Sequence, residues 1–260
     1  MIVGKYMGKV KSNYKIFNLI RKNLGHLDLH TQMRTKPLIK YIITNKNVIK
    51  NKNILEIGCG EGNNCFEIFF NSEYNNIIGF DLNETAINSA NKIADELGIS
   101  NRIKFYYSDA TKYDYSSIGN IDLLLLIDFL EHISDPKSFL ESIKNILDDK
   151  SEIIVSVPTY LYKKVFGEYF HVKVGHVKDG YSLAELNVLF SNIGYKPKLY
   201  SYNTGIFGNV GCFLYYRLNF NNKYLNLLKQ LVLYPFSFID FINNKYISSS
   251  LFVVYEKAKK

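Results

Sequence analysis

The chain of 260 residues is poor in cysteine and lacks long apolar runs. Its three cysteines, Cys59, Cys65 and Cys212, have no metal-site spacing and are too few for a disulfide framework, which is typical of a reducing compartment. The basic N-terminus has no apolar core long enough for a signal peptide. No apolar run is long and uncharged enough to cross a bilayer. These absences argue against a disulfide-stapled secreted domain or a membrane-spanning protein, and predict a cytoplasmic location.

Apolar residues are abundant, at 47% of the chain. A chain of this length and composition can bury one large α/β core as a single domain. Segments typical of strands alternate with segments typical of helices through the middle of the chain, and no internal repeat is present. The pattern therefore predicts a layered α/β sheet.

A glycine-rich corner follows the first predicted strand. Residues 54–57 form a short apolar run that contains Glu56, and residues 63–71 have the apolar spacing of a helix. Between the two lie three glycines at alternate positions, Gly58, Gly60 and Gly62. Glycines at such a turn let the backbone approach a ligand closely, so the pattern predicts the nucleotide-binding corner of a doubly wound sheet.

The glycine spacing indicates which nucleotide. A dinucleotide fingerprint would require a glycine at position 63, which is Asn63. The observed Gly-x-Gly-x-Gly, preceded by Glu56, resembles motif I of the class I S-adenosylmethionine-dependent methyltransferases. Because turns of many kinds use glycine, the segments downstream of the glycine corner carry the comparison.

Acidic residues end the next two predicted strands. Residues 76–81 form an apolar strand ending in Asp81, 19 residues after Gly62, where a carboxylate can bind both ribose hydroxyls. A helix is predicted at 83–98 and a third strand at 102–107, followed by Asp109. Asp109 matches the position that contacts the adenine amino group in the methyltransferase family.

The resemblance implies S-adenosylmethionine as cofactor and S-adenosylhomocysteine as product. Cys59 lies inside the glycine turn, where we expect it to pack rather than to act as a nucleophile. The implied cofactor-binding residues are Glu56, Gly58, Cys59, Gly60, Gly62, Asp81, Leu82, Asp109, Ala110 and Asp128.

The second half of the chain extends the resemblance. Residues 121–127 predict a fourth, fully covered parallel strand, and residues 128–136 resemble the E-x-L-E-H-(x)2-D-P segment of many small-molecule methyltransferases. Helices are predicted at 137–147 and 181–194, the latter with a capping box of Ser182 and Glu185. Further strands are predicted at 152–157 and 251–255, with a sixth strand after residue 194.

The expected fold is α/β, a doubly wound, seven-stranded, mostly parallel sheet of the Rossmann-like methyltransferase type. We expect a basic helical N-terminal arm at 1–50 and a cofactor-binding core at 51–204 plus 250–260. An aromatic-rich insertion or lid at 205–249 separates the last two strands, with a helix predicted at 224–234.

Two histidines are candidate catalytic residues. His132 follows the fourth strand near the expected methyl position, and His176 lies, with His171, on the loop after the fifth strand. An imidazole can remove the proton of a hydroxyl acceptor near neutral pH. Asp128, Glu131 and His132 also resemble the Glu-x-x-Glu-His metal cluster of some O-methyltransferases, although the first Glu is replaced by Asp. The pattern favours a site without metal, with a divalent ion as the alternative.

The net charge of +8 is concentrated in the N-terminal arm. One acid, Asp28, lies within residues 1–40, and the remaining residues hold 23 basic and 23 acidic side chains. A solvated helical face is the simpler interpretation, and capture of an anionic acceptor is the functional one. The nine basic residues are Lys5, Lys9, Lys11, Lys15, Arg21, Lys22, Arg34, Lys36 and Lys40.

The basic arm and the aromatic-rich insertion carry the information on the acceptor. The insertion at 205–249 favours a lid or dimer surface over a membrane-resting element for a lipid-linked substrate. The arm and insertion resemble methyltransferases acting on sugars, so we expect O-methylation of a sugar or glycan precursor. A quinone, lipid or aromatic small molecule is the alternative. RNA is less favoured, since no RNA-binding module is present. A non-catalytic binding protein of the same fold is the alternative from another class.

Overall fold

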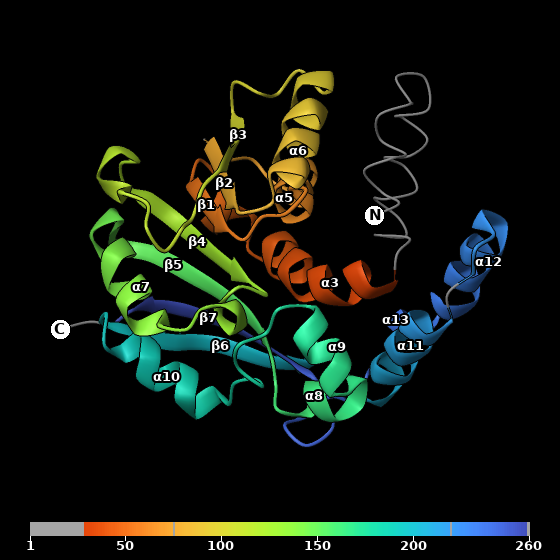
Figure 1. Ribbon diagram of the computed structural model, residues 1–260. Helices are drawn as coiled ribbons and strands as arrows, with labels where there is room; N and C mark the ends of the chain where they lie inside the picture. Colours follow the sequence, from red (N-terminus) through yellow and green to blue (C-terminus); the bar gives the residue numbers. More distant parts are fainter. Residues whose placement is uncertain (1–28, 75, 219, 259–260) are drawn as a thin grey trace.

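In the computed structural model, seven strands form one sheet in the order β3-β2-β1-β4-β5-β7-β6 (Figure 1). The structure describes residues 29–74, 76–218 and 220–258. The strands are β1 (Asn53–Ile57), β2 (Asn76–Asp81), β3 (Ile103–Tyr107), β4 (Ile121–Ile127), β5 (Leu147–Pro158), β6 (Tyr195–Asn203) and β7 (Ser250–Lys257).

The first five strands pair in parallel, and β7 lies antiparallel between β5 and β6. The strand order reverses direction between β1 and β4, which is the switch point at which doubly wound sheets bind ligands. This arrangement confirms the predicted seven-stranded, mostly parallel sheet.

Helices cover both faces of the sheet (Figure 1). On one face, α7 (Pro136–Ile143) and α10 (Leu183–Ser191) pack Phe139 and Phe190 against Leu124 and Val155. On the other face, α3 (Leu29–Thr44), α5 (Asn63–Asn71) and α6 (Glu84–Glu96) pack against a cluster that includes Leu125. Because successive strand residues point to opposite faces, unbroken apolar strands such as β4 contribute to both cores.

The remaining elements form one end of the molecule or short connections. They are α4 (Lys46–Ile49), α8 (Leu161–Phe166), α9 (Glu168–Lys173), α11 (Ile206–Arg217), α12 (Lys223–Leu233), α13 (Phe236–Ile239) and the 3-10 turns η1 (Tyr115–Ser117), η2 (Leu130–His132) and η3 (Lys144–Ile146). Figure 1 shows α11 to α13 projecting beyond the sheet, next to the start of α3.

Local start signals behave as predicted at two helices. Ser182 and Glu185 form a reciprocal capping box at α10, and Pro136 begins α7 with Asp135 accepting from the Ser138 backbone N–H. The predicted helix at 137–147 is too long, because α7 ends at Ile143 and β5 already begins at Leu147. Ser151 donates to the Ile121 carbonyl and so stabilises the irregular start of β5, which sequence periodicity does not reveal.

The N-terminal arm and the insertion are described in part. Residues 1–28, with six of the nine basic positions of the arm, lie outside the described residues. The described part is helical, and α3 packs against both α5 and α11. The predicted helix in the insertion is confirmed as α12, whereas α11 was not predicted. Among the described residues, no helix is long and apolar enough to cross a membrane.

Candidate functional site

The glycine corner lies at the carboxyl edge of the sheet, between β1 and α5. The N–H groups of Gly58 and Cys59 both donate to the carbonyl of Phe80 at 2.8 and 3.0 Å, which ties the turn to β2. Gly60 and Gly62 have φ of +53° and +75°, a region that favours glycine. A Cβ added at Gly62 would lie 2.5 Å from the Phe105 ring. A Cβ added at Gly60 would have none of the described atoms within 4 Å. Gly60 therefore faces open space in which a ligand can approach the backbone.

Asp81 ends β2 beside this turn. Its carboxylate accepts the Gly60 N–H at 2.7 Å and the Asn83 N–H at 2.8 Å. Both bonds are to backbone groups, so they fix the carboxylate at the rim of the glycine corner. The position suits the predicted contact with ribose hydroxyls.

Glu56 is fully buried beneath the corner. Its oxygens accept from Asn64 Nδ2 at 2.6 Å and from Cys65 Sγ at 2.9 Å, both on α5. Burial raises the pKa of Glu56 to about 7, although the Cys65 and Asn64 hydrogen bonds act in the opposite direction. The side chain thus holds the first turn of α5 against β1. Burial also raises the pKa of the Cys59 thiol well above its usual value, which favours the predicted packing role over that of a nucleophile.

The predicted adenine side of the site lies at the ends of β2 and β3. Ser108 N–H donates to the Asp81 carbonyl at 3.1 Å, which brings the two strand ends together. Leu82 is 65% exposed, and Ala110 is buried. Asp109 accepts from Thr111 and pairs with Lys112 at 2.9 Å, and these contacts lower its pKa, first through the Thr111 hydroxyl. Asp109 remains at the surface, on the same edge as Asp81.

Asp128 follows β4 in a left-handed conformation, with φ of +50°. A non-glycine residue there is uncommon and often marks a functional turn. Its Oδ2 lies 3.0 Å from Nε of Arg34 on α3. Burial raises the pKa of Asp128, while Arg34 and His132 act to lower it. Burial lowers the pKa of Arg34, but Asp128, together with Tyr216, Tyr162 and Glu131, outweighs burial and leaves the pKa raised.

Sequence reasoning missed the Arg34–Asp128 pair. The sequence pattern indicates Arg34 only as part of a basic arm, and Asp128 only as a residue near the donor or a metal. The separation of the two residues along the chain hides their contact. The only signal in the sequence is the surplus of basic residues in the arm, which indicates that an anionic group lies near it but does not say which one.

A second group of side chains lies just beyond Asp128. One ligand atom each from Glu131, His132 and His176 fall within 4.8 Å of one another. Within the described residues, both carboxylate oxygens of the buried Glu131 lack a hydrogen-bond partner, and Nδ1 of His176 also has none. Nε2 of His176 lies 3.9 Å from Glu131 Oε1. Of the three residues considered for the alternative with a metal, Glu131 and His132 come together, whereas Asp128 pairs with Arg34 and His176 lies beside the other two.

The titration behaviour of this group follows from burial. Burial, reinforced by Asp128, raises the pKa of Glu131 well above its usual value. Burial also lowers the pKa of His176 to about 3, so its imidazole stays neutral. Nδ1 of the exposed His132 lies 3.0 Å from the Gly175 carbonyl and must donate to it, which leaves the lone pair of Nε2 for another partner. A buried carboxylate without a hydrogen-bond partner among the described residues and two imidazole side chains are a ligand set that fits a divalent cation.

Two hollows adjoin the first half of α3. A small cavity is bounded by Met33, Arg34, Asp128, Tyr162 and Thr204. A larger pocket of about 520 Å³ shares Met33 and Thr204 with it and runs along α3. The larger pocket is lined by charged, amide and aromatic side chains, among them Lys36, Lys40, Asn203, Phe238, Phe241 and Asn243.

A family model described as a methyltransferase domain matches residues 49–193. This range begins just before β1 and ends after α10, so it contains the glycine corner, Asp81, Asp109 and the segment that follows β4.

Curated relatives match over a part of their length. Norajmaline N-methyltransferase of Rauvolfia serpentina is 29% identical over 107 residues, which is 41% of this chain and 36% of that protein. Ubiquinone biosynthesis O-methyltransferase of Aliivibrio fischeri is 23% identical over 135 residues, or 50% of this chain and 56% of the relative. The matches thus span about a third to just over half of the relatives' length.

Solved structures share the fold over most of the chain. Magnesium protoporphyrin IX methyltransferase from Synechocystis, with bound S-adenosylhomocysteine, has a TM-score of 0.56 and 13% identity, covering 99% of this chain and 98% of that one. Coclaurine N-methyltransferase, bound to N-methylheliamine and S-adenosylhomocysteine, has a TM-score of 0.58 and 12% identity, covering 85% and 70%.

Proposed function

The chain belongs to the methyltransferase-domain family, and we propose that it transfers a methyl group from S-adenosylmethionine to a small-molecule acceptor. The acceptor class that we propose is a sugar or glycan precursor, methylated on oxygen. The observation that carries the proposal is the glycine corner beside Asp81, with open space at Gly60 and a carboxylate at its rim.

We assign donor binding to the corner and the neighbouring strand ends. The backbone around Gly58, Gly60 and Gly62 would lie along the methionine part, Asp81 would accept from the ribose hydroxyls, and Leu82 and Asp109 would contact the adenine. Glu56 and Cys59 would act from beneath, holding the turn in shape. Ala110 and Asp128 complete the proposed donor site.

The chemistry then follows from the sulfonium. An acceptor oxygen attacks the methyl carbon in line, the carbon–sulfur bond breaks with its electron pair going to sulfur, and the acceptor proton leaves. Much of the enzyme's task is to hold this geometry and exclude water. His132 is the proposed base, because its Nε2 carries a free lone pair when Nδ1 donates to Gly175. We propose that the neutral imidazole of His176 lies beside the Glu131 carboxyl group and helps to form the wall of the catalytic site.

The larger pocket along α3 supports an anionic sugar acceptor. Lys36 and Lys40 supply positive charge, and amides such as Asn203 suit hydroxyl groups. The rings of Phe238 and Phe241 can pack against the apolar faces of a sugar. Arg34 lines the small cavity, which shares Met33 and Thr204 with the pocket, and its guanidinium is suited to orient an anionic acceptor that reaches this cavity.

A second candidate is the metal-assisted version of the same reaction. Glu131, His132 and His176 would hold a divalent cation, and the unpartnered buried carboxylate favours it. Such an ion would supply Lewis-acid stabilisation of an acceptor oxygen. Without the ion, His132 alone would remove the proton.

Donor binding is the first test. Calorimetric titration with S-adenosylmethionine should show binding to the wild type and at least roughly tenfold weaker binding to Asp81→Asn, because the ribose loses its carboxylate. Asp95→Asn on the exposed side of α6 is the matched control and should bind as the wild type does. Absence of donor binding in the wild type would favour the non-catalytic binding protein instead.

Acceptor class is the second test. The protein would be incubated with methyl-labelled donor and separate fractions of sugar nucleotides, lipid-linked sugars, quinones and RNA. Label in a sugar fraction supports the proposal. Label only in the quinone fraction would establish the alternative acceptor, and label in RNA would contradict a small-molecule acceptor.

A further inference from the structure

Helix α12 carries its apolar side chains on the outside. Five of its residues are about half exposed: Leu225, Leu227, Leu228, Leu231 and Val232, at 46 to 62%. At about 100° per residue these positions span an arc of roughly 160° on one side of the helix. A surface helix of a globular protein normally turns such a stripe toward the core, so this helix is inverted.

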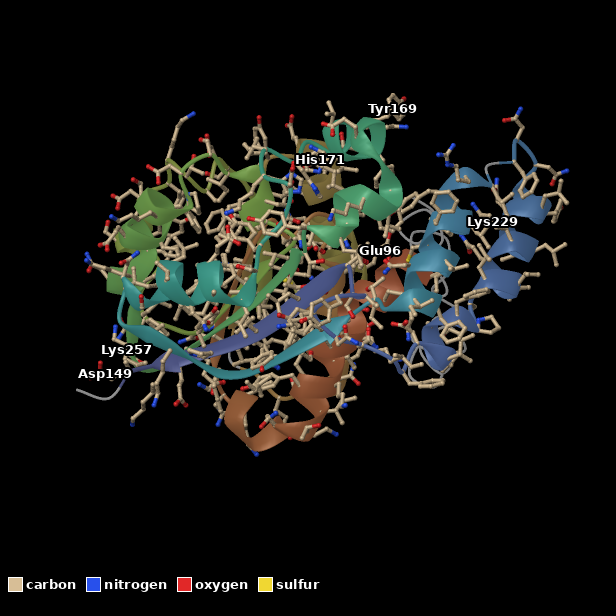
Figure 2. All side chains as sticks on the ribbon, turned by 90° about the horizontal axis from the view of Figure 1, so that it is seen from below. Glu96, Asp149, Tyr169, His171, Lys229 and Lys257 are labelled. Atoms are coloured by element: carbon tan, nitrogen blue, oxygen red, sulfur yellow. The ribbon has the colours of Figure 1, made fainter. Side chains whose placement is uncertain are left out.

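Polar contacts fix the inverted orientation. Lys229 Nζ donates to the carbonyls of Leu218 at 2.8 Å and Tyr215 at 3.1 Å, near the end of α11. Gln230 is 7% exposed, and Asn226 and Phe220 exchange hydrogen bonds. Figure 2 shows α12, with Lys229 labelled, at the outer end of the molecule. Rotating the helix to bury its leucines would break these bonds, so the exposed stripe is a built feature.

The charge of the insertion complements an anionic surface. Residues 205–249 contain one acid, Asp240, whose carboxylate is buried and accepts the N–H groups of Gly205 and Gly208 at 3.0 and 2.9 Å. A second copy of the chain would bring the same excess of positive charge to the contact, and the repulsion between the two copies opposes association. The basic residues of the segment are Arg217, Lys223, Lys229 and Lys245.

We propose that the outward stripe of α12, defined by Leu225, Leu227, Leu228, Leu231 and Val232, docks on the surface of an anionic lipid bilayer. The helix has 11 residues, or about 16 Å, against the roughly 30 Å of a bilayer core. It therefore lies in the plane of the interface, with leucines at the acyl boundary. The basic residues of the insertion add attraction to acidic headgroups.

The docking stripe is joined to the proposed acceptor site. On its inner side, Leu233 of α12 packs with Leu29 and Met33 of α3 and with Cys212 of α11. Met33 lines both hollows at the first half of α3. A docked α12 would hold this end of the molecule at a bilayer, from which a lipid-anchored acceptor can reach the pocket. Docking itself does not rest on the proposed function, because it requires neither donor nor acceptor.

The test is flotation of the full-length protein with vesicles. The wild type should float with phosphatidylglycerol–phosphatidylcholine vesicles, and weakly with phosphatidylcholine alone or in about 0.5 M salt. Leu228→Glu/Leu231→Glu should lower the bound fraction about tenfold. The control Val188→Glu/Tyr200→Glu makes the same charge change at exposed positions on α10 and β6 and should float like the wild type. Equal flotation of the two double variants would overturn the proposal. Failure of the wild type to float with the anionic vesicles would overturn it as well.

Two further readouts identify other occupants of the stripe. The thiol of a Leu228→Cys variant should react quickly with a charged maleimide, and anionic vesicles should protect it. Protection without vesicles in a monomer would mean that residues 1–28 cover the stripe. A dimer by light scattering, dissociated by Leu228→Glu/Leu231→Glu, would mean that a second copy does. Either result overturns membrane docking, and neither affects donor binding, so the proposed function is tested separately.

Discussion

Nε of Arg34 lies 3.0 Å from Oδ2 of Asp128, linking the N-terminal helix α3 to the turn after β4. The contact closes the end of α3 over the switch point of the sheet. It also places a cation at the wall of the small cavity, which shares Met33 and Thr204 with the larger pocket. One ion pair thus connects the fold of the arm with the proposed acceptor site.

Removing the cation should destabilise the protein. Arg34→Ala leaves Asp128 buried without its partner, and we expect a loss of at most about 3 kcal/mol, since Arg34 keeps 31% side-chain exposure. Urea denaturation measures this loss. Arg34→Ala/Asp128→Ala should lose less than the single variant. Lys40→Ala, an exposed change on the same helix, is the control. Equal stability of the Arg34 and Lys40 variants would contradict a stabilising pair.

Two glycines of one turn should separate ligand binding from folding. Gly60→Ala introduces a Cβ into open space at a φ of +53°, so we expect a loss of only about 1 kcal/mol. Donor binding should nevertheless weaken at least tenfold, because the methyl group occupies ligand space. Gly62→Ala also forces a Cβ to 2.5 Å from Phe105, and should lose roughly 2–5 kcal/mol. Calorimetry and urea denaturation measure the two effects. Unchanged donor binding by Gly60→Ala would show that the ligand does not use this space.

The stability of the protein should fall as pH rises through the range set by Glu56. Its pKa rises from about 4.5 when unfolded to about 7 when folded, so the folded state holds the proton more tightly. Glu56 therefore makes its full contribution to the free energy of unfolding below about pH 4.5. This contribution, roughly 3 kcal/mol, is lost as the pH rises to about 7. Unfolding free energies at pH 5 and 8 should therefore differ less in Glu56→Gln than in the wild type. The control Glu96→Gln, a change at an exposed position, should show the same difference between pH 5 and pH 8 as the wild type. If Glu56→Gln also showed the wild-type difference, the raised pKa of Glu56 would be contradicted.

A divalent cation should raise the melting temperature if Glu131, His132 and His176 bind it. At a concentration 100 times the dissociation constant, binding adds about 2.7 kcal/mol, or roughly 5–10 °C for a chain of this size. After dialysis against a chelator, addition of Mn²⁺ or Zn²⁺ measures the shift. His176→Asn should abolish it, and His171→Asn, a change at a buried neighbouring histidine, should retain it. No shift with any divalent cation would remove the metal-assisted candidate and leave His132 as the proposed base.

Much of the sheet could be predicted from local pattern. Short apolar runs ended by Glu56 or Asp81 predict parallel strands, and the glycines between β1 and α5 predict the tight turn that the structure contains. The start of α7 at Pro136 and the capping box of α10 follow from side chains near in sequence. The end of α7 could not be predicted, because Lys144–Ile146 tighten into the 3-10 turn η3 and Leu147 pairs with Ile121 of β4, a contact that local periodicity does not encode.

The candidate site also contains some contacts that local sequence predicts and others that only the tertiary structure forms. Glu131 and His132 are neighbours in sequence, and their pairing in one cluster was open to prediction. His176 joins them because α8 and α9 fold back over the end of β4, where the N–H of Val177 donates to the Glu131 carbonyl at 2.9 Å. Arg34 reaches Asp128 from a helix nearly a hundred residues earlier. No local propensity encodes either contact.

By itself, the sequence determined the strand–glycine–helix corner, the acids at the strand ends and hence the family of the fold. These features depend on backbone freedom and on apolar spacing, which act over a few residues. Tertiary structure decided which charges meet and which stay unpaired: Asp128 pairs with Arg34, and the Glu131 carboxylate has no hydrogen-bond partner among the described residues. It also decided that the leucines of α12 face outward. The reason is that ion pairing and burial depend on distance in space, which packing sets.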